Sequence, residues 1–156
     1  MKKLLKGFLA VCLLMTSVVG CESGDCMLSS ESYCSISFVD AQGKGVKLQD
    51  SLTVSAMPNI VIINRKLGAS GMDLPLSYTA VVDTFVMRYS ARLADTLWLE
   101  HQNHPYFSSM ECGTVMHYKL MNIRSTSNLI DSVQIVNPEV TNTLKDNVKI
   151  YFTVNN

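Results

Sequence analysis

VKIYFTV, residues 148–154, alternates apolar and polar side chains more regularly than any other stretch of the chain. Its apolar positions are Val148, Ile150, Phe152 and Val154. Successive side chains of a β-strand point to opposite faces, so this period of two predicts a strand with one face in a core. We therefore expect Ile150 and Phe152 to be buried. Lys149 and Thr153, on the opposite face, should be exposed.

Similar short runs recur along the chain at roughly 8–12-residue spacing, with turn residues between them. The expected strands cover residues 33–40, 51–57, 60–64, 84–89, 96–101, 114–123, 132–136 and 148–154. Residues 74–76 contain Pro75, which predicts an edge strand or no strand. No window of a dozen residues has a helical period. The pattern predicts an all-β fold, an antiparallel β-sandwich with an immunoglobulin-like layout, and a small barrel is the alternative.

The N-terminus has the layout of a secretory signal. Three lysines precede an apolar run over residues 8–19, which is too short for a bilayer core that needs roughly 20 residues. The block VVGC, residues 18–21, resembles a bacterial lipobox. That resemblance implies that residues 1–20 are removed and that Cys21 becomes the acylated N-terminus of the mature protein.

The predicted organisation is a lipoprotein signal peptide at 1–20, a tether at 21–32 and a single β-sandwich domain at 33–156. The tether is expected because residues 21–32 are polar and contain few apolar side chains. The expected location is the cell envelope, on the outer membrane, with the lipid as the membrane link. Whether the domain faces the periplasm or the exterior is left open.

The charge balance excludes one class of partner. The chain has 13 basic and 13 acidic residues, and Lys2, Lys3 and Lys6 lie in the signal, so the mature part has 10 basic and 13 acidic residues. A net charge of −3 with no basic stripe does not favour phosphate binding. We therefore expect no nucleic-acid partner, and the charge gives no attraction to an anionic membrane surface.

From Leu48 onward the chain resembles a family of small lipoproteins of the Bacteroidota that share a domain of unknown function. The resemblance lies in DSLTV (50–54), LPLS (74–77), DTL (95–97), HPYFSSMECG (104–113), His117, NLIDSV (128–133) and NPEV (137–140). Near the tether, GDC (24–26) fits the early Asp-Cys of the family, whereas Cys34 is not part of the pattern. The resemblance implies a lipoprotein with an all-β fold, and it implies no activity.

Three cysteines remain after the signal and the lipidation site: Cys26, Cys34 and Cys112. An exported domain permits disulfides. We predict a Cys26–Cys112 bridge because the tether must be fixed to the sandwich and both positions fit the family pattern. Cys34–Cys112 is the nearest alternative.

Metal and catalytic chemistry have weaker signals. A zinc site of His101, His104, His117 and Cys112 is an alternative, but His-x-x-His followed by Pro105 fits no common zinc spacing. Cys112 with a histidine would be the candidate for thiol catalysis, which requires the two side chains within hydrogen-bond reach. We expect no metal, no cofactor and no catalytic residue. His101 and His104 are expected in a solvated loop, and His117 is expected to point to water.

A candidate ligand surface consists of Trp98, Tyr106 and His104, with Phe107 nearby. Aromatic side chains could line a sugar or peptide cleft, although packing of Trp98 under a second covered face is the competing expectation. Three Asp-Ser/Thr-apolar triplets, at 50–52, 95–97 and 131–133, resemble acceptors of O-glycosylation. The simpler interpretation is turn chemistry, because an Asp before the first Ser or Thr of a strand is ordinary there.

These observations predict a non-catalytic, lipid-anchored binding or assembly module of the cell envelope, with other envelope proteins or glycans as partners. The alternatives are a ligand binder for envelope glycan or metal, and a thiol-dependent enzyme that uses Cys112.

Overall fold

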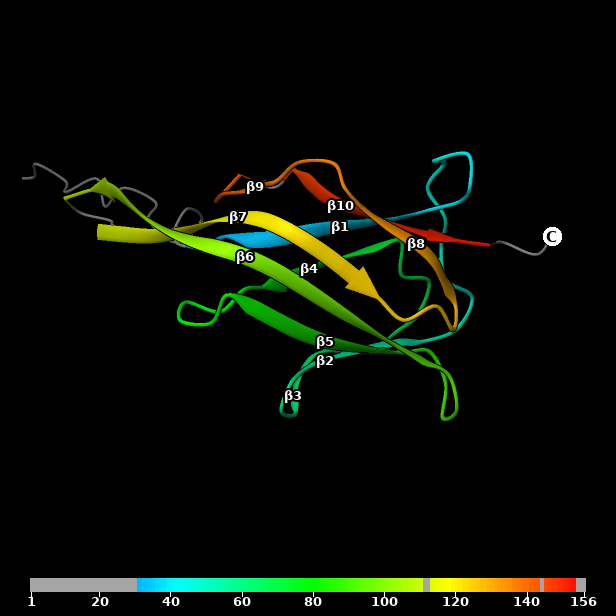
Figure 1. Ribbon diagram of the computed structural model, residues 1–156. Coiled ribbons are helices and arrows are strands. Elements are labelled where there is room, and N and C mark those ends of the chain that lie inside the picture. The colour runs from blue at the N-terminus through cyan, green and yellow to red at the C-terminus, as the bar shows by residue number, and fades with distance from the viewer. Residues whose placement is uncertain (1–30, 111–112, 144, 154–156) are drawn as a thin grey trace, which may run out of the picture.

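The structure is a computed structural model that describes residues 31–110, 113–143 and 145–153 (Figure 1). These residues form ten β-strands. They are β1 (Tyr33–Val39), β2 (Leu52–Ala56), β3 (Ile60–Lys66), β4 (Gly71–Pro75), β5 (Val82–Arg88), β6 (Ala94–Ser109), β7 (Gly113–Ser125), β8 (Ile130–Ile135), β9 (Glu139–Val140) and β10 (Asp146–Phe152). The part of the chain that the structure describes contains no helix long and apolar enough to cross a membrane.

The strands build two sheets that pack face to face, which confirms the predicted β-sandwich (Figure 1). One sheet has the order β4-β1-β10-β8, and the other has the order β3-β2-β5-β6-β7-β9. The first and last strands, β1 and β10, are adjacent and parallel, whereas the other pairings are antiparallel. β4 is an edge strand that ends at Pro75, as the proline at this position predicts.

The core lies between the sheets, and β10 has the predicted register. Ile150 and Phe152 are buried, which confirms the inward face of this strand. Thr153 is exposed, and Lys149 is half-buried. The ring of Phe152 meets the ring of Phe38 edge to face, with centroids 5.3 Å apart. Aromatic pairs in this geometry add stability beyond the buried area.

The β6–β7 hairpin is longer than the sequence predicts. Residues 102–109, expected between two strands, continue β6, and β7 extends to Ser125. The two strands stay paired as far as Ser109 and Gly113. Most side chains of residues 102–107 are exposed on both faces, so this part of the hairpin has no alternation of apolar and polar residues.

The sandwich has two distinct ends (Figure 1). We call the end at which β1 begins the tether end, because residues 21–32 precede it. Tyr33 pairs with Pro75 there, and the loop of residues 76–81 follows immediately. The tip of the β6–β7 hairpin projects at this end. The other end, where the parallel strands β1 and β10 both finish, we call the far end.

Candidate functional site

The three residues of the predicted ligand surface lie on the outer face of β6. Trp98, His104 and Tyr106 occupy alternate positions of a strand whose opposite face carries buried Leu97, Leu99 and His101. At about 3.4 Å per residue, Trp98 and His104 are about 20 Å apart along the strand. The structure therefore separates them into two places, one at Trp98 and one at His104 and Tyr106.

Trp98 is neither in the core nor freely exposed. It is half-buried, and it pairs across the strands with Arg124, whose guanidinium carbon lies 5.5 Å from the ring centroid. A cation over an aromatic face is attracted by the ring quadrupole. The arginine thus occupies the surface that a sugar ring would stack against.

At the second place, two rings lie flat against each other. Tyr106 and His117 stack with centroids 4.9 Å apart and an angle of 10° between the ring planes. His104, which is exposed, lies opposite His117 across the hairpin. His117 was expected to point to water, but this is wrong for its Nε2, which is buried and has no hydrogen-bond partner among the described residues. Tyr106 covers one face of the imidazole, and the side chain of His117 as a whole is half-buried.

His101 corrects the expectation of a solvated loop histidine. It lies in β6 with its side chain buried, and its ring meets that of Tyr118 edge to face. Its Nε2 is 3.0 Å from Oδ2 of Asp83, and its Nδ1 is 2.7 Å from Oδ1 of Asn103. Sequence reasoning missed this group, because its three members come from separate positions and none has a motif.

The amide of Asn103 fixes the arrangement of this group. Its nitrogen donates to the carbonyl oxygens of Ser77, Tyr78 and Ala80, so its own oxygen faces the histidine. Both ring nitrogens of His101 therefore lie within hydrogen-bond distance of a side-chain oxygen. Asp83 also accepts from the backbone N–H of Ser77. We call His101, Asp83 and Asn103 the loop clamp, because together they hold the loop of residues 76–81.

A second buried polar group lies at the far end. Asp95 is buried, and it accepts hydrogen bonds from the hydroxyl of Thr126 and from the backbone N–H groups of Asn128, Leu129 and Ile130. A carboxylate is well suited to several convergent backbone donors. The Asp-Thr pair at this position thus serves turn chemistry, one of the two interpretations of the triplet 95–97.

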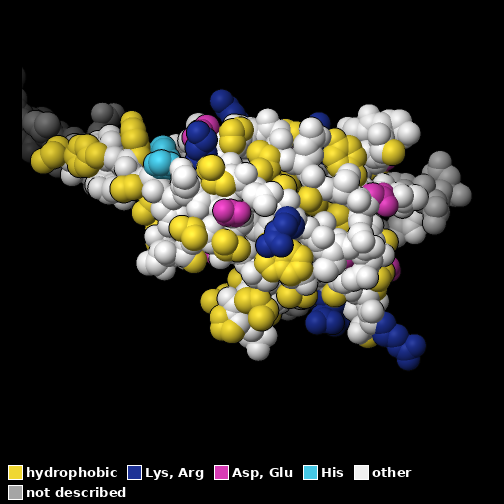
Figure 2. Space-filling view, in the orientation of Figure 1, with side chains coloured by type: hydrophobic (Ala, Val, Ile, Leu, Met, Phe, Trp, Pro, Cys, Tyr) yellow, Lys and Arg dark blue, Asp and Glu magenta, His cyan; other side chains and the backbone are white. Residues whose placement is uncertain are grey.

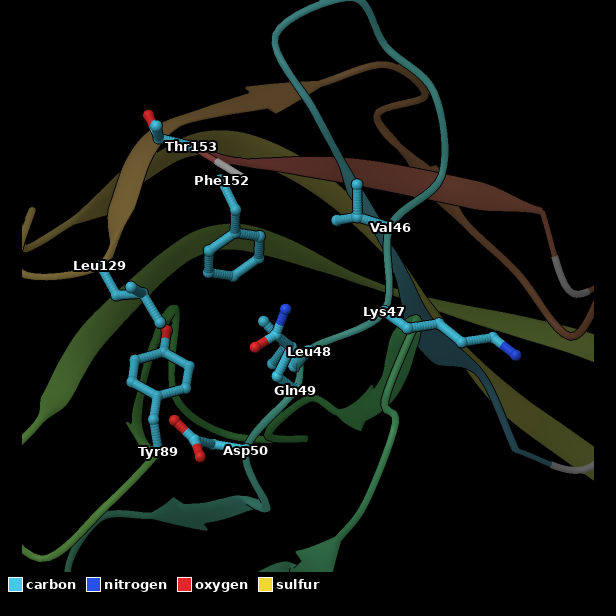
Figure 3. A pocket seen from close by; sticks show the side chains of 9 residues that line it. All are labelled: Val46, Lys47, Leu48, Gln49, Asp50, Tyr89, Leu129, Phe152 and Thr153. Atoms are coloured by element: carbon cyan, nitrogen blue, oxygen red, sulfur yellow. The ribbon is translucent and has the colours of Figure 1, made fainter. Parts of the chain in front are cut away.

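The far end also contains a cavity of about 240 Å³ (Figure 3). Its walls come from the β1–β2 connection, the end of β5, the start of β8 and the end of β10. The lining residues are Val46, Lys47, Leu48, Gln49, Asp50, Tyr89, Leu129, Phe152 and Thr153. Hollows of about 420 Å³ and 400 Å³ flank it on either side. The far end is therefore concave, with an apolar interior and a polar rim.

Tyr89 gives this cavity its one buried hydroxyl among the residues that line it. The side chain is almost fully buried, and its hydroxyl lies near the carboxylate of Asp95 without meeting the distance and angle of a hydrogen bond to any described residue. Burial, and then the nearby negative charge of Asp95, raise the pKa of Tyr89 well above its usual range. The group stays a neutral phenol at physiological pH, and it can donate a hydrogen bond.

The predicted covalent sites lie mainly outside the described residues: Cys21, Cys26 and Cys112 are among the residues whose structure is not described. Cys34 is a free, buried thiol, so the alternative Cys34–Cys112 bridge is not formed. Burial raises the pKa of Cys34 to about 12, which keeps it a thiol rather than a thiolate. Within the described ranges, no three His, Cys, Asp or Glu side chains are placed to hold a metal ion.

Comparison with known families gives one match. Residues 51–152 match a family of unknown function, DUF6452. The chain belongs to this family. The match begins at β2 and runs through β10, so it includes the loop clamp, Asp95 and Tyr89. No curated protein and no solved structure matches the chain.

Proposed function

We propose that this member of the DUF6452 family is a lipid-anchored, non-catalytic binding module of the bacterial cell envelope that takes its ligand at the far end. The lipobox-like block at residues 18–21 supports the anchor. The observation that carries the binding role is the concave far end, which lies at the opposite end of the sandwich from the start of β1 (Figure 1). A protein held by its N-terminus presents this end away from the membrane.

The chemistry of the cavity favours recognition over reaction. Val46, Leu48 and Phe152 supply apolar walls, and the phenol of Tyr89 supplies a hydrogen-bonding group that a ligand would reach by displacing the side chains that cover it. Ligand sites typically combine such walls with a few placed polar groups. Two buried polar side chains elsewhere have structural partners: Asp95 binds the amides of a turn, and His101 binds Asp83 and Asn103 beside a loop. The best-fitting ligand is a small, mainly apolar group with one hydrogen-bonding atom, carried on a larger envelope molecule.

The anchor is tested by Cys21→Ala in the full-length chain. The variant should stay unprocessed or leave the membrane fraction, whereas the parent protein should partition with membranes and have an acylated N-terminus by mass spectrometry. The matched control is Cys34→Ser, which should keep both properties. An unchanged mass and membrane partition in Cys21→Ala would refute lipidation at this residue.

The binding end is tested by photo-crosslinking in cells. A benzophenone amino acid replaces Gln49 at the cavity rim in one variant and exposed Gln102 on the outer face of β6 in another. Far-end binding predicts a discrete adduct from position 49, lost when Leu48→Trp fills the cavity, and none from position 102. Adducts from position 102 alone would favour the outer face with Trp98 and Tyr106, which is the surface suited to an envelope glycan.

A further inference from the structure

The tether end exposes a set of large apolar side chains. They come from two segments that are distant in sequence, the loop of residues 76–81 and the tip of the β6–β7 hairpin. The residues are Tyr78, Val81, Tyr106, Phe107 and Met110, and we call them the apolar tip. Met110 is 92% exposed and Phe107 is 58% exposed. Figure 2 shows hydrophobic side chains along the projecting hairpin at this end.

The composition of the apolar tip is typical of a lipid–water interface. Tyrosine rings have an apolar body and a polar hydroxyl, and such rings gather at the headgroup level of membranes. Residues 104–110 contain no Lys, Arg, Asp or Glu. Residues 104–110 can therefore enter the interface without the desolvation of a charge, whereas the next residue, Glu111, favours the headgroup level.

The point at which the tether joins β1 limits the distance between the apolar tip and a membrane that holds Cys21. The described chain enters β1 at Tyr33, beside Pro75 and the loop of residues 76–81. The twelve residues 21–32 span at most about 40–43 Å when fully extended. The hairpin continues for seven residues beyond Asn103, which is about 24 Å. A bilayer that holds a lipid on Cys21 is thus within reach of Phe107 and Met110.

The loop clamp gives this end a defined shape. Asn103 donates to the carbonyl of Tyr78, and the backbone N–H of His101 donates to the carbonyl of Val81. Both exposed side chains are therefore on a loop whose backbone carbonyls are held by several hydrogen bonds to β6. Several hydrogen bonds to one short loop restrict its backbone, so this loop should keep its shape at a surface.

We propose that the apolar tip docks on the lipid bilayer, with Phe107 and Met110 in the interfacial region beside the acylated N-terminus. This proposal rests on the lipid anchor of the proposed function. Lipid chains and an apolar protein patch together hold a protein more firmly, and in a more fixed orientation, than either contact alone. The docked orientation points the cavity at the far end away from the membrane.

The test places a fluorescent reporter at the tip of the mature, lipidated protein. Trp98→Phe removes the one native tryptophan, and Phe107→Trp then adds a reporter at an exposed position. The matched control is Ile60→Trp in the same background, because Ile60 is 65% exposed but lies on the β2–β3 hairpin. Each variant is reconstituted into phosphatidylcholine vesicles with or without bromine on the acyl chains.

Docking predicts several-fold stronger quenching by brominated lipid at position 107 than at position 60, with a blue-shifted emission at 107 only. Equal quenching at the two positions, or none at 107, would overturn docking. Protection of 107 from aqueous iodide without quenching by brominated lipid would place the tip against protein and would also overturn it. Sedimentation with the vesicles reports the anchor separately: if both variants sediment and 107 is unquenched, docking alone fails. If neither sediments, the anchor fails, and docking fails with it.

Discussion

The two ends of the sandwich are each held by a buried polar group, yet they present opposite surfaces. At the far end, Asp95 gathers backbone N–H groups around one carboxylate, and the surface beside it is a cavity. At the tether end, His101 joins Asp83 and Asn103, and the surface beside it is a projecting apolar tip. A cluster of hydrogen-bonded polar groups thus lies beside the concave surface at one end and beside the projecting surface at the other end.

The difference lies in which groups each cluster holds. Asp95 bonds to consecutive amides of one turn, and this fixes Leu129 in the cavity wall. In the loop clamp, Asn103 of β6 donates to carbonyls of a separate loop, and Asp83 of β5 accepts from a backbone N–H of that loop. Removing Asp95 should therefore disturb mainly the wall of the cavity. Removing a member of the loop clamp should increase mainly the mobility of the loop of residues 76–81.

The largest expected effect is at the far end. Phe152→Ala should cost about 3–5 kcal/mol of unfolding free energy, because the ring packs against Phe38 and Tyr89 and lines the cavity. Urea denaturation measures the loss. The control is Thr153→Ala, one position along and exposed, which should cost less than about 1 kcal/mol. Similar losses at the two positions would contradict the register of β10.

Asp95→Ala should be nearly as costly, at about 3–4 kcal/mol, because it leaves three backbone N–H groups of one turn without their acceptor. Hydrogen exchange at Leu129 should accelerate, whereas exchange at Val81 should not change. Asp131→Ala is the matched control, because Asp131 begins a similar Asp-Ser/Thr-apolar triplet but is exposed, and it should cost less than about 1 kcal/mol. Equal losses would show that burial does not distinguish the two aspartates.

His101→Ala should cost about 2–3 kcal/mol, because the half-buried carboxylate of Asp83 and the amide oxygen of Asn103 both lose a hydrogen-bond partner. The loop of residues 76–81 should exchange amide hydrogens faster and should become sensitive to proteolysis, while exchange at Leu129 stays unchanged. His104→Ala, three residues away and exposed, should leave both properties as they are. A faster amide exchange at Leu129 in His101→Ala would contradict the prediction that the two ends are stabilised independently.

The sequence predicts the sandwich well where one face of a strand is buried and the other is not. In β10, Ile150 faces the core, whereas Lys149 and Tyr151 face outward and are half-buried. The period of two in the sequence therefore matches the pattern of burial. The outer part of the β6–β7 hairpin has solvent on both faces, so no periodicity marks residues 102–109 as strand. These two strands are held by pairing with each other, which composition does not reveal.

The buried polar groups were less predictable than the core. Asp95 was expected to shape a turn before its own strand, but it lies within β6 and binds the turn at residues 126–130 instead, which no local pattern indicates. His101 had no local signal either, because its partners Asp83 and Asn103 are brought to it by pairing of β5 with β6 and by the loop. A histidine in a polar stretch looks solvated until the fold supplies its acceptors.

The smallest effects compare two buried tyrosines, one at each end. Tyr118 donates to the carbonyl of Leu76 at 3.0 Å, next to the clamped loop, so Tyr118→Phe should cost about 1–1.5 kcal/mol. Burial raises the pKa of Tyr118 to about 12. The unfolded chain ionises above about pH 10 while the folded state keeps its proton, so stability falls as pH rises above 10. Tyr118→Phe should therefore make this alkaline loss less steep.

Tyr89→Phe is the same chemical change at the far end, and it should cost almost nothing. The hydroxyl has no partner among the described residues, so its removal relieves a buried polar group instead of breaking a bond. Urea denaturation of the ligand-free protein should show no loss, or a gain within about 1 kcal/mol. The crosslinked adduct from position 49 should nevertheless weaken, because the ligand loses its hydrogen bond. A loss of stability comparable to that of Tyr118→Phe would show that the hydroxyl is structural, and the cavity would then have no group reserved for a ligand.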